Sequence, residues 1–212
     1  MAYPSARPRI SSVASRPRPG YASPMPTRNL WAPWRIDYIK GLDPAANPTG
    51  DAADKGDTAH SGKPSTGCFL CDLADPDLPL EKWPDALLLH RGQRCMILLN
   101  RYPYTNGHLL IAPHEHVGDL CDISDPQRGE LMDLTNHACR ALQLAMNPQG
   151  MNVGMNIGRC AGAGVPGHAH MHVVPRWHGD ANFMQTLGGV RVIPQSLEHS
   201  YTQLKDALAR LD

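Results

Sequence analysis

The feature that most constrains the fold of this 212-residue chain is a short run in which histidine alternates with an apolar residue. The run is His-Ala-His-Met-His-Val-Val, residues 168–174, and it ends at Pro175. Alternation followed by two valines and a proline predicts a β-strand over these residues. Successive side chains of a strand point to opposite faces, so we expect His168, His170 and His172 on one face. Each imidazole can act as a nucleophile, a proton donor or a metal ligand near neutral pH.

A glycine-rich loop, residues 158–167, leads directly into the histidine run. Glycine allows the backbone to approach an anion closely and to turn its N–H groups toward it. Imidazoles beside such a loop indicate chemistry on phosphate. The alternative interpretation is three half-exposed strand histidines that share no role.

The other apolar segments predict a domain that contains both strands and helices. Strands are expected over residues 86–90, 95–100, 108–113 and 151–157, and helices from Ser124 to just before Pro148 and over residues 197–211. Ser124 and Gln127 form a capping-box pattern at the start of the first helix. Five strands joined largely as hairpins, with two helices, indicate an α+β domain with a mostly antiparallel five-stranded sheet.

Part of the chain lacks the composition of a folded domain. Residues 1–28 are rich in Pro, Arg and Ser and contain no acidic residue, so they are expected to form a disordered basic arm. Residues 29–40 are expected to pack on the core through Trp31 and Trp34. Residues 41–66 resemble a flexible Gly/Pro/Asp-rich insert, which leaves residues 67–212 as one folded domain.

The overall composition argues against several classes of protein. Lys plus Arg equals Asp plus Glu, at 20 each, so a general nucleic-acid footprint is not expected. No apolar run approaches the length of a membrane span, and the N-terminus lacks a secretory signal pattern. The six cysteines are therefore expected to be thiols in a cytoplasmic protein.

The sequence resembles the histidine triad (HIT) superfamily, whose motif His-φ-His-φ-His-φ-φ, with φ apolar, is matched by residues 168–174. Similar segments are Asn-Leu-Trp-Ala-Pro-Trp-Arg at 29–35, Cys-Phe-Leu-Cys at 68–71, Gly-His-Leu-Leu at 107–110, Pro-His-Glu-His at 113–116 and Ala-Gly-Ala-Gly at 161–164. The last loop and the segment after Pro175 are most similar to bacterial diadenosine tetraphosphate phosphorylase-like members. The resemblance implies a HIT-like fold and a homodimer.

The resemblance also implies a reaction, the cleavage of dinucleoside polyphosphates through a nucleotidyl-histidine intermediate. His170 would be the nucleophile, and the backbone carbonyl of His168 would hold its other ring nitrogen. His172 would bind the phosphate or the leaving group. The substrate would be an adenine dinucleotide, and the acceptor either water or inorganic phosphate. A nucleoside phosphoramidate hydrolase and a non-catalytic nucleotide sensor are the alternatives.

The same resemblance implies a nucleotide pocket. Asn156, Gly164 and Val165 would line the phosphate site, Asn100 would contact ribose, and Ile97 and Leu99 would form the wall for adenine. Many relatives carry Gln or Ser where this chain has Gly164. The glycine leaves only a backbone N–H and gives more room for an inorganic phosphate acceptor. For Asn100 and the apolar wall, ordinary strand-end and core roles are the alternative.

Cys68 and Cys71 have the spacing of half a zinc site. The resemblance implies that His116 and the first triad histidine, His168, complete a structural Cys2His2 site. Such an ion would tie the cysteine segment to the catalytic strand. A pair of free or redox-active thiols is the alternative, and His114 competes with His116 as a ligand.

Overall fold

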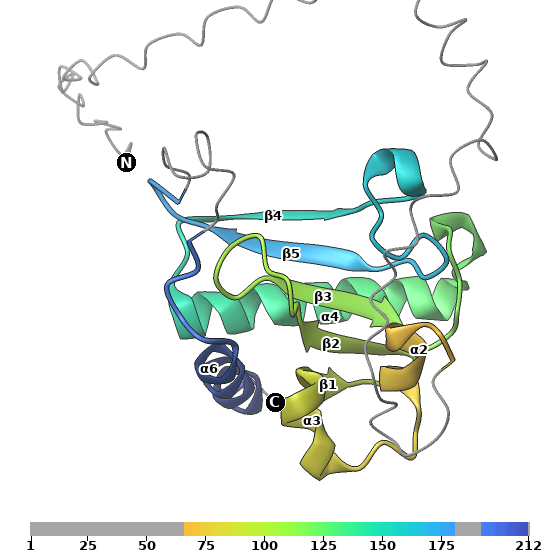
Figure 1. Ribbon diagram of the computed structural model, residues 1–212, viewed down its shortest axis with the longest axis horizontal. Coiled ribbons are helices and arrows are strands. Elements are labelled where there is room, and N and C mark those ends of the chain that lie inside the picture. Colours follow the sequence, from red (N-terminus) through yellow and green to blue (C-terminus); the bar gives the residue numbers. More distant parts are fainter. Residues whose placement is uncertain (1–65, 181–191, 212) are drawn as a thin grey trace, which may run out of the picture. The chain divides into compact units, whose positions relative to one another are not determined.

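The computed structural model describes residues 66–180 and 192–211 (Figure 1). The arm predicted at 1–28, the segment at 29–40 and all but the last residue of the insert at 41–66 lie outside the described residues. Among the described residues, no helix is both long and apolar enough to cross a membrane.

One antiparallel sheet of five strands forms the centre of the domain, in the order β1-β2-β3-β5-β4 (Figure 1). The strands are β1 (Leu88–Arg91), β2 (Cys95–Leu99), β3 (Leu109–Pro113), β4 (Gly150–Met155) and β5 (Met171–Arg176). The predicted α+β class, the strand number and the hairpin between β1 and β2 are confirmed. Because β5 inserts between β3 and β4, the last of the described strands lies inside the sheet.

The predicted strand over 168–174 is displaced in the structure, where β5 begins only at Met171. His168 donates its backbone N–H to the carbonyl of Val165, and Ala169 donates to Val117, so this segment bonds to loops and not to β3. Pro175, expected to end the strand, lies within it. On the β3 side, its carbonyl accepts a hydrogen bond from the Thr105 hydroxyl, because the pairing of β3 with β5 ends at Val173. The proline has no N–H to donate, but at this position no hydrogen bond between the two strands is lost.

Both long predicted helices are present, α4 (Asp125–Met146) and α6 (Leu197–Ala209). The capping box of Ser124 and Gln127 forms as predicted, and α4 ends at Asn147 in the left-handed conformation (φ 46°). Two short helices, α2 (Phe69–Ala74) and α3 (Trp83–Ala86), have no counterpart in the sequence predictions. They contain six and four residues, too few to show a helical period. Three single 3₁₀ turns, η2 (Leu80–Lys82), η3 (Leu120–Asp122) and η4 (Arg159–Ala161), complete the described elements.

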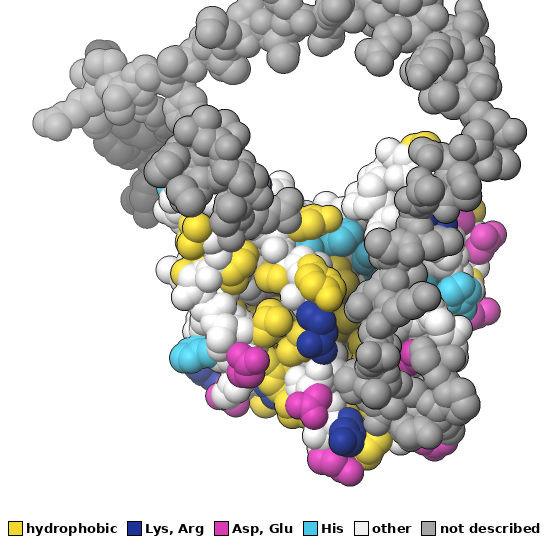
Figure 2. All heavy atoms as spheres, in the orientation of Figure 1, with side chains coloured by type: hydrophobic (Ala, Val, Ile, Leu, Met, Phe, Trp, Pro, Cys, Tyr) yellow, Lys and Arg dark blue, Asp and Glu magenta, His cyan; other side chains and the backbone are white. Residues whose placement is uncertain are grey.

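The strand register divides the core between the two faces of the sheet. Ile97, Leu99, Leu109, Ile111 and Val173 pack with α4 and α6 on one face, and Met96, Leu98, Leu110 and Ala112 pack with the α2 segment on the other. Leu98 pairs with Leu110, and Leu110 pairs with His172, so these three side chains share a face. His172 therefore lies on the face opposite α4, where Figure 2 shows histidine beside hydrophobic side chains.

Candidate active site

His170 and His172 form a close pair at the start of β5, with ring centroids 4.9 Å apart. His170 lies in the extended residues just before the strand and is buried, while His172, the second residue of β5, is half-buried. The glycine-rich loop of residues 158–167 ends in a turn at His168, so it comes directly before this pair in the sequence. The site combines two imidazoles of different burial with a loop rich in backbone N–H groups.

A backbone contact determines which nitrogen of His170 carries the proton. Its Nδ1 lies 2.8 Å from the carbonyl oxygen of His168, the contact expected from the sequence. A carbonyl only accepts, so Nδ1 is the donor, and in the neutral ring Nε2 keeps its lone pair. Burial lowers the pKa of His170, which favours this neutral form. The ring therefore presents an unprotonated nitrogen suited to nucleophilic attack.

A fourth histidine, His108, contacts the triad and was not among the predicted site residues. It is fully buried, and its Nε2 lies 2.9 Å from Nδ1 of His172. The backbone N–H of Tyr104 donates to Nδ1 of His108 over 3.1 Å, so Nδ1 is an acceptor and Nε2 carries the proton. His108 then donates to His172, which leaves the hydrogen of His172 on Nε2. His170 and His172 thus have opposite tautomers, one with a free lone pair and the other with a free N–H.

The sequence contained a signal for His108, but it required the strand order. His108 directly precedes β3 and alternates with Leu110, the residue paired with His172. Side chains two apart on a strand share a face, so His108 is a diagonal neighbour of His172 once β3 and β5 are adjacent. The sequence alone does not show that β3 and β5 are neighbours in the sheet.

The electrostatic surroundings keep His172 neutral near pH 7. Burial, with a smaller contribution from His170, lowers the pKa of His172 to about 4. The ring of Tyr104 stacks beside it, with centroids 5.9 Å apart and planes 16° apart. In this resting state His172 is a neutral hydrogen-bond donor. A phosphate anion placed next to the ring would raise its pKa.

Four predicted metal ligands converge at the edge of this site, Cys68, Cys71, His116 and His168. Their candidate ligand atoms all lie within 4.8 Å of one another. Cys68 Sγ and Cys71 Sγ are 3.4 and 3.5 Å from His168 Nδ1, and Cys71 Sγ is 3.1 Å from His116 Nδ1. Two thiols and two imidazoles around one point are the donor set of a tetrahedral zinc site. The alternative ligand His114 is not part of the cluster.

The second nitrogen of His168 supports its assignment as a ligand. Nε2 lies 2.9 Å from the carbonyl of Pro113, so it carries the proton and leaves Nδ1 free to face the cysteine sulfurs. The His168 ring packs edge-on against His116, with centroids 5.2 Å apart. The structure thus gives His168 two tasks: its imidazole faces the cysteines and its carbonyl holds His170. The three triad imidazoles do not form the single row expected from one uninterrupted strand.

The two residues expected to form the adenine wall lie on the other face of the sheet from His172. Ile97 and Leu99 are fully buried on the α4 face, opposite His172, and cannot contact a ligand bound there. The alternation is as predicted, but only the pairing of β2 with β3 and of β3 with β5 shows which set faces His172. That set includes Leu98, which lies between the two predicted residues.

The remaining predicted pocket residues lie in the loop before β3 and in the loop between β4 and β5. The Asn100 carboxamide lies 3.2 Å from Nδ1 of His108 and accepts the N–H of Tyr102, so it supports the loop before β3. Asn156 donates to the carbonyl of Gly162 across the glycine-rich loop, over 3.4 Å. Val165 is half-buried.

Gly164 is exposed and has open space around it. No heavy atom lies within 4 Å of the place where a Cβ would stand. Left-handed backbone occurs elsewhere in the loop, at Gly158 (φ 78°) and Gly162 (φ 87°), where glycine is strongly favoured. The glycine at 164 therefore satisfies neither a steric nor a backbone requirement of this structure.

Comparisons with known proteins identify similar sequences and structures. Residues 83–179 match the HIT domain family. The AP-4-A phosphorylase of Mycobacterium tuberculosis is 35% identical over 183 residues, which cover 86% of this chain and 85% of that protein. The adenosine 5'-monophosphoramidase hnt1 of Schizosaccharomyces pombe is 28% identical over 109 residues, 51% of this chain and 74% of that protein. A zinc-bound histidine triad family protein from Mycobacterium smegmatis superimposes with a TM-score of 0.55 and 28% identity, covering 68% of this chain and 95% of that structure.

Proposed function

Since this chain belongs to the HIT family and is a nucleotide-processing protein, we propose that it cleaves dinucleoside polyphosphates of the diadenosine tetraphosphate type through a covalent intermediate on His170. The observation that carries the proposal is the pair of opposite tautomers at His170 and His172. One ring presents a lone pair to phosphorus, and its neighbour presents an N–H to the departing oxygen. The similarity to the M. tuberculosis phosphorylase supports the choice of substrate.

In the first proposed step, Nε2 of His170 attacks the α-phosphorus of one adenylate half. The Pα–N bond forms as the Pα–O bond to the remaining triphosphate chain breaks, and ATP leaves. The Nε2–H of His172 faces the departing oxygen and stabilises its negative charge through a hydrogen bond. The hydrogen bond from Nδ1 to the carbonyl of His168 stabilises the positive charge that develops on the His170 ring.

In the second proposed step, an oxygen of inorganic phosphate attacks the same phosphorus and the Pα–N bond breaks. The product is ADP, and His170 regains its lone pair. The open space around Gly164 supports phosphate as the acceptor, because no side chain occupies that part of the loop. Water in the same role would release AMP and make the reaction a hydrolysis.

We propose that the cysteine–histidine cluster holds a structural zinc ion. The two thiols, the imidazoles of His116 and His168, and the bond from His168 to the carbonyl of Pro113 fit that ion. The zinc-bound M. smegmatis relative supports the assignment. When bound, the ion would fix the chain around His168 and supply no Lewis acid to the reaction. Because the carbonyl of His168 orients His170, a fixed His168 also fixes the nucleophile.

Metal analysis of the purified protein tests the zinc proposal. About one zinc per chain is expected, and Cys71→Ser is expected to lose most of it while Cys139→Ser, a half-buried helix position outside the cluster, retains it. Equal zinc content in the two variants would assign the ion to other residues.

Product analysis with diadenosine tetraphosphate, in the presence and absence of inorganic phosphate, tests the reaction. We expect ATP and ADP only when phosphate is present, and loss of turnover in His170→Ala. The matched control is His90→Ala on the edge strand β1, which should retain turnover. ATP and AMP without phosphate would indicate hydrolysis. Full activity of His170→Ala would contradict the covalent mechanism.

A nucleoside phosphoramidate hydrolase is the second candidate. The similarity to the S. pombe phosphoramidase supports it, and the same His170 chemistry would serve a P–N bond in place of a P–O bond. Adenosine 5'-monophosphoramidate, assayed beside the tetraphosphate, separates the two substrates. A non-catalytic sensor would bind nucleotide and turn over neither.

We further propose a cytoplasmic homodimer. None of the six cysteines is paired in a disulfide, which supports a reducing compartment. Strand β4 is an edge of the sheet, and its Val153 is 49% exposed, which supports association through that edge. Sedimentation analysis should give twice the chain mass, with Val153→Lys shifting the equilibrium toward monomer. A monomer at micromolar concentration would exclude the dimer.

A further inference from the structure

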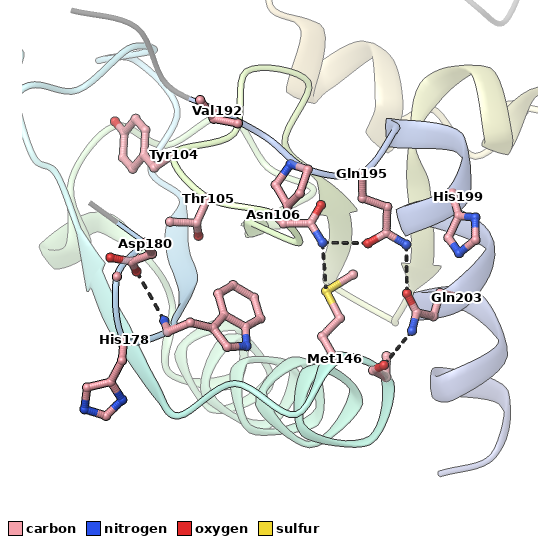
Figure 3. Close-up of a pocket in the computed structure, with 14 residues that line it drawn as sticks. Tyr104, Thr105, Asn106, Met146, His178, Asp180, Val192, Gln195, His199 and Gln203 are labelled. Atoms are coloured by element: carbon pink, nitrogen blue, oxygen red, sulfur yellow. Dashed lines mark hydrogen bonds between the residues drawn. The ribbon is translucent and has the colours of Figure 1, made fainter. Parts of the chain in front are cut away.

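A cavity of about 640 Å³ lies beyond the C-terminal end of β5. It is bounded by the loop before β3, the end of α4 and the first turns of α6 (Figure 3). Its volume is within the range of roughly 300–1,000 Å³ that is typical of small-molecule sites. The site described above uses His170 and His172 at the opposite end of β5, so none of its histidines lines this cavity.

The chemistry of the cavity is that of a site for an uncharged, polar group. Its lining residues include no lysine or arginine in the described part of the chain. Its one carboxylate, Asp180, is held by Arg176 through contacts of 2.5 and 2.9 Å. A phosphate would find no cation among these residues, whereas a heteroaromatic ring would meet the side chains of Trp177 and Tyr104.

A chain of side-chain amides crosses the cavity wall and is already ordered. Asn106 donates to Gln195 (2.6 Å), Gln195 donates to Gln203 (3.0 Å), and Gln203 donates to the carbonyl of Ala145 (2.5 Å) (Figure 3). Each glutamine commits one of its two N–H donors in these bonds. The second donor of each can bond to a base edge without breaking the chain.

Tyr104 connects this cavity to the reacting histidines. It lines the cavity, and its ring stacks on His172, with centroids 5.9 Å apart. His172 is the residue whose N–H faces the departing oxygen in the proposed reaction. A polyphosphate chain that extends from His172 past Tyr104 would therefore reach the cavity.

We propose that the cavity binds the distal nucleoside of the dinucleoside polyphosphate, the half that departs with the leaving group. This inference rests on the proposed function and deepens it by giving the second nucleoside a site of its own. The aromatic side chains would stack on the base, and the amide chain would bond to its edge. The site would distinguish a dinucleotide from a mononucleotide with the same phosphate chain.

Binding measurements with the inactive His170→Ala variant test the inference without any need for turnover. The probes are diadenosine tetraphosphate and adenosine 5'-tetraphosphate, which share the phosphate chain and differ in the distal nucleoside. In this background we add His199→Trp, which narrows the cavity from an exposed position of α6. The matched control is Glu198→Trp, on the same helix but not in the cavity lining. Gln203→Ala tests the site by a second route, because it removes the last side-chain amide of the chain.

We expect both variants to raise the Kd for the dinucleotide about tenfold and to leave the Kd for the mononucleotide unchanged. His199→Trp would displace the stacked base, and Gln203→Ala would remove a hydrogen bond to its edge. The control should change neither value. Equal effects on both probes, or no effect on either, would overturn the inference. Failure of the proposed function is seen separately, as absence of turnover of the dinucleotide by the unaltered chain.

Discussion

The hydrogen bond from His108 to His172 offers the sharpest test of the site. Glutamine can place its amide nitrogen near the position of imidazole Nε2, whereas asparagine reaches only the position of Nδ1. His108→Gln therefore keeps a donor to His172, and His108→Asn removes it from the same buried position. Both variants replace the imidazole with a carboxamide, so a difference between them reports the hydrogen bond to His172 and not the loss of the ring at position 108.

The magnitude follows from the 2.9 Å contact and its burial. A hydrogen bond contributes about 0.5–1.5 kcal/mol net, and a buried nitrogen left without a partner costs about 1–3 kcal/mol. In His108→Asn, His172 avoids that cost by rotating or by moving its proton to Nδ1. The competent arrangement is then less favourable by about 1.5–4.5 kcal/mol, which corresponds to roughly a ten- to thousandfold loss of kcat.

Steady-state turnover of diadenosine tetraphosphate with inorganic phosphate gives the kcat of each variant. Nitrogen-15 NMR of the imidazoles reports directly which ring nitrogen of His172 carries the proton. We expect His108→Gln to stay within a few fold of the unaltered chain, well above His108→Asn. Equal kcat in the two variants, or a proton found on Nδ1 of His172 in the unaltered chain, would refute the assignment of tautomers.

Three further predictions concern stability. In a urea titration, Gly118→Ala should destabilise the fold by about 1–3 kcal/mol, because the new Cβ would lie 2.9 Å from the carbonyl oxygen of Pro166. Gly129→Ala, at an exposed position of α4 with open space around it, should stabilise the fold by about 0.5–1 kcal/mol. Leu142→Ala should cost about 2–5 kcal/mol in that titration, since Leu142 is fully buried, and a smaller loss would show that the core relaxes around it. The pKa of His172, near 4 when folded and near 6.5 when unfolded, means that the unfolded chain binds more protons between these values. Stability should therefore fall by about 1–2 kcal/mol as the pH drops from 6.5 to 4, after allowance for the half-exposed ring, and His172→Phe should flatten that slope in urea titrations across the window.

Local patterns predicted the secondary structure well wherever they were long. The capping box of Ser124 and the helical period behind it located α4, and short apolar runs between turn signals located the strands. The helices α2 and α3 were missed because tertiary packing, and not a local period, stabilises so few residues. The start of β5 was misjudged because the backbone at 168 and 169 bonds to loops that are distant in sequence.

In the site, too, contacts between residues close in sequence could be predicted, and contacts between distant residues could not. The contact from His170 to the carbonyl of His168 spans two residues, so the histidine motif was enough to predict it. Ile97 and Leu99 lie on the face opposite His172, which the sequence could not show, because alternation identifies two sets of side chains without saying which set faces the histidines. His108 was missed because its contact with His172 joins residues 64 apart in sequence.

By itself, the sequence determined the α+β class, the long helix, the strand runs and the residue types available for chemistry. These depend on interactions between near neighbours, which period, capping and motif spacing record directly. Only the tertiary structure decided which face of the sheet carries the histidines and which ring nitrogens hold the protons. It also decided that four candidate metal ligands from three distant segments meet within 4.8 Å. These depend on the order in which strands pair, because strand order places distant residues side by side.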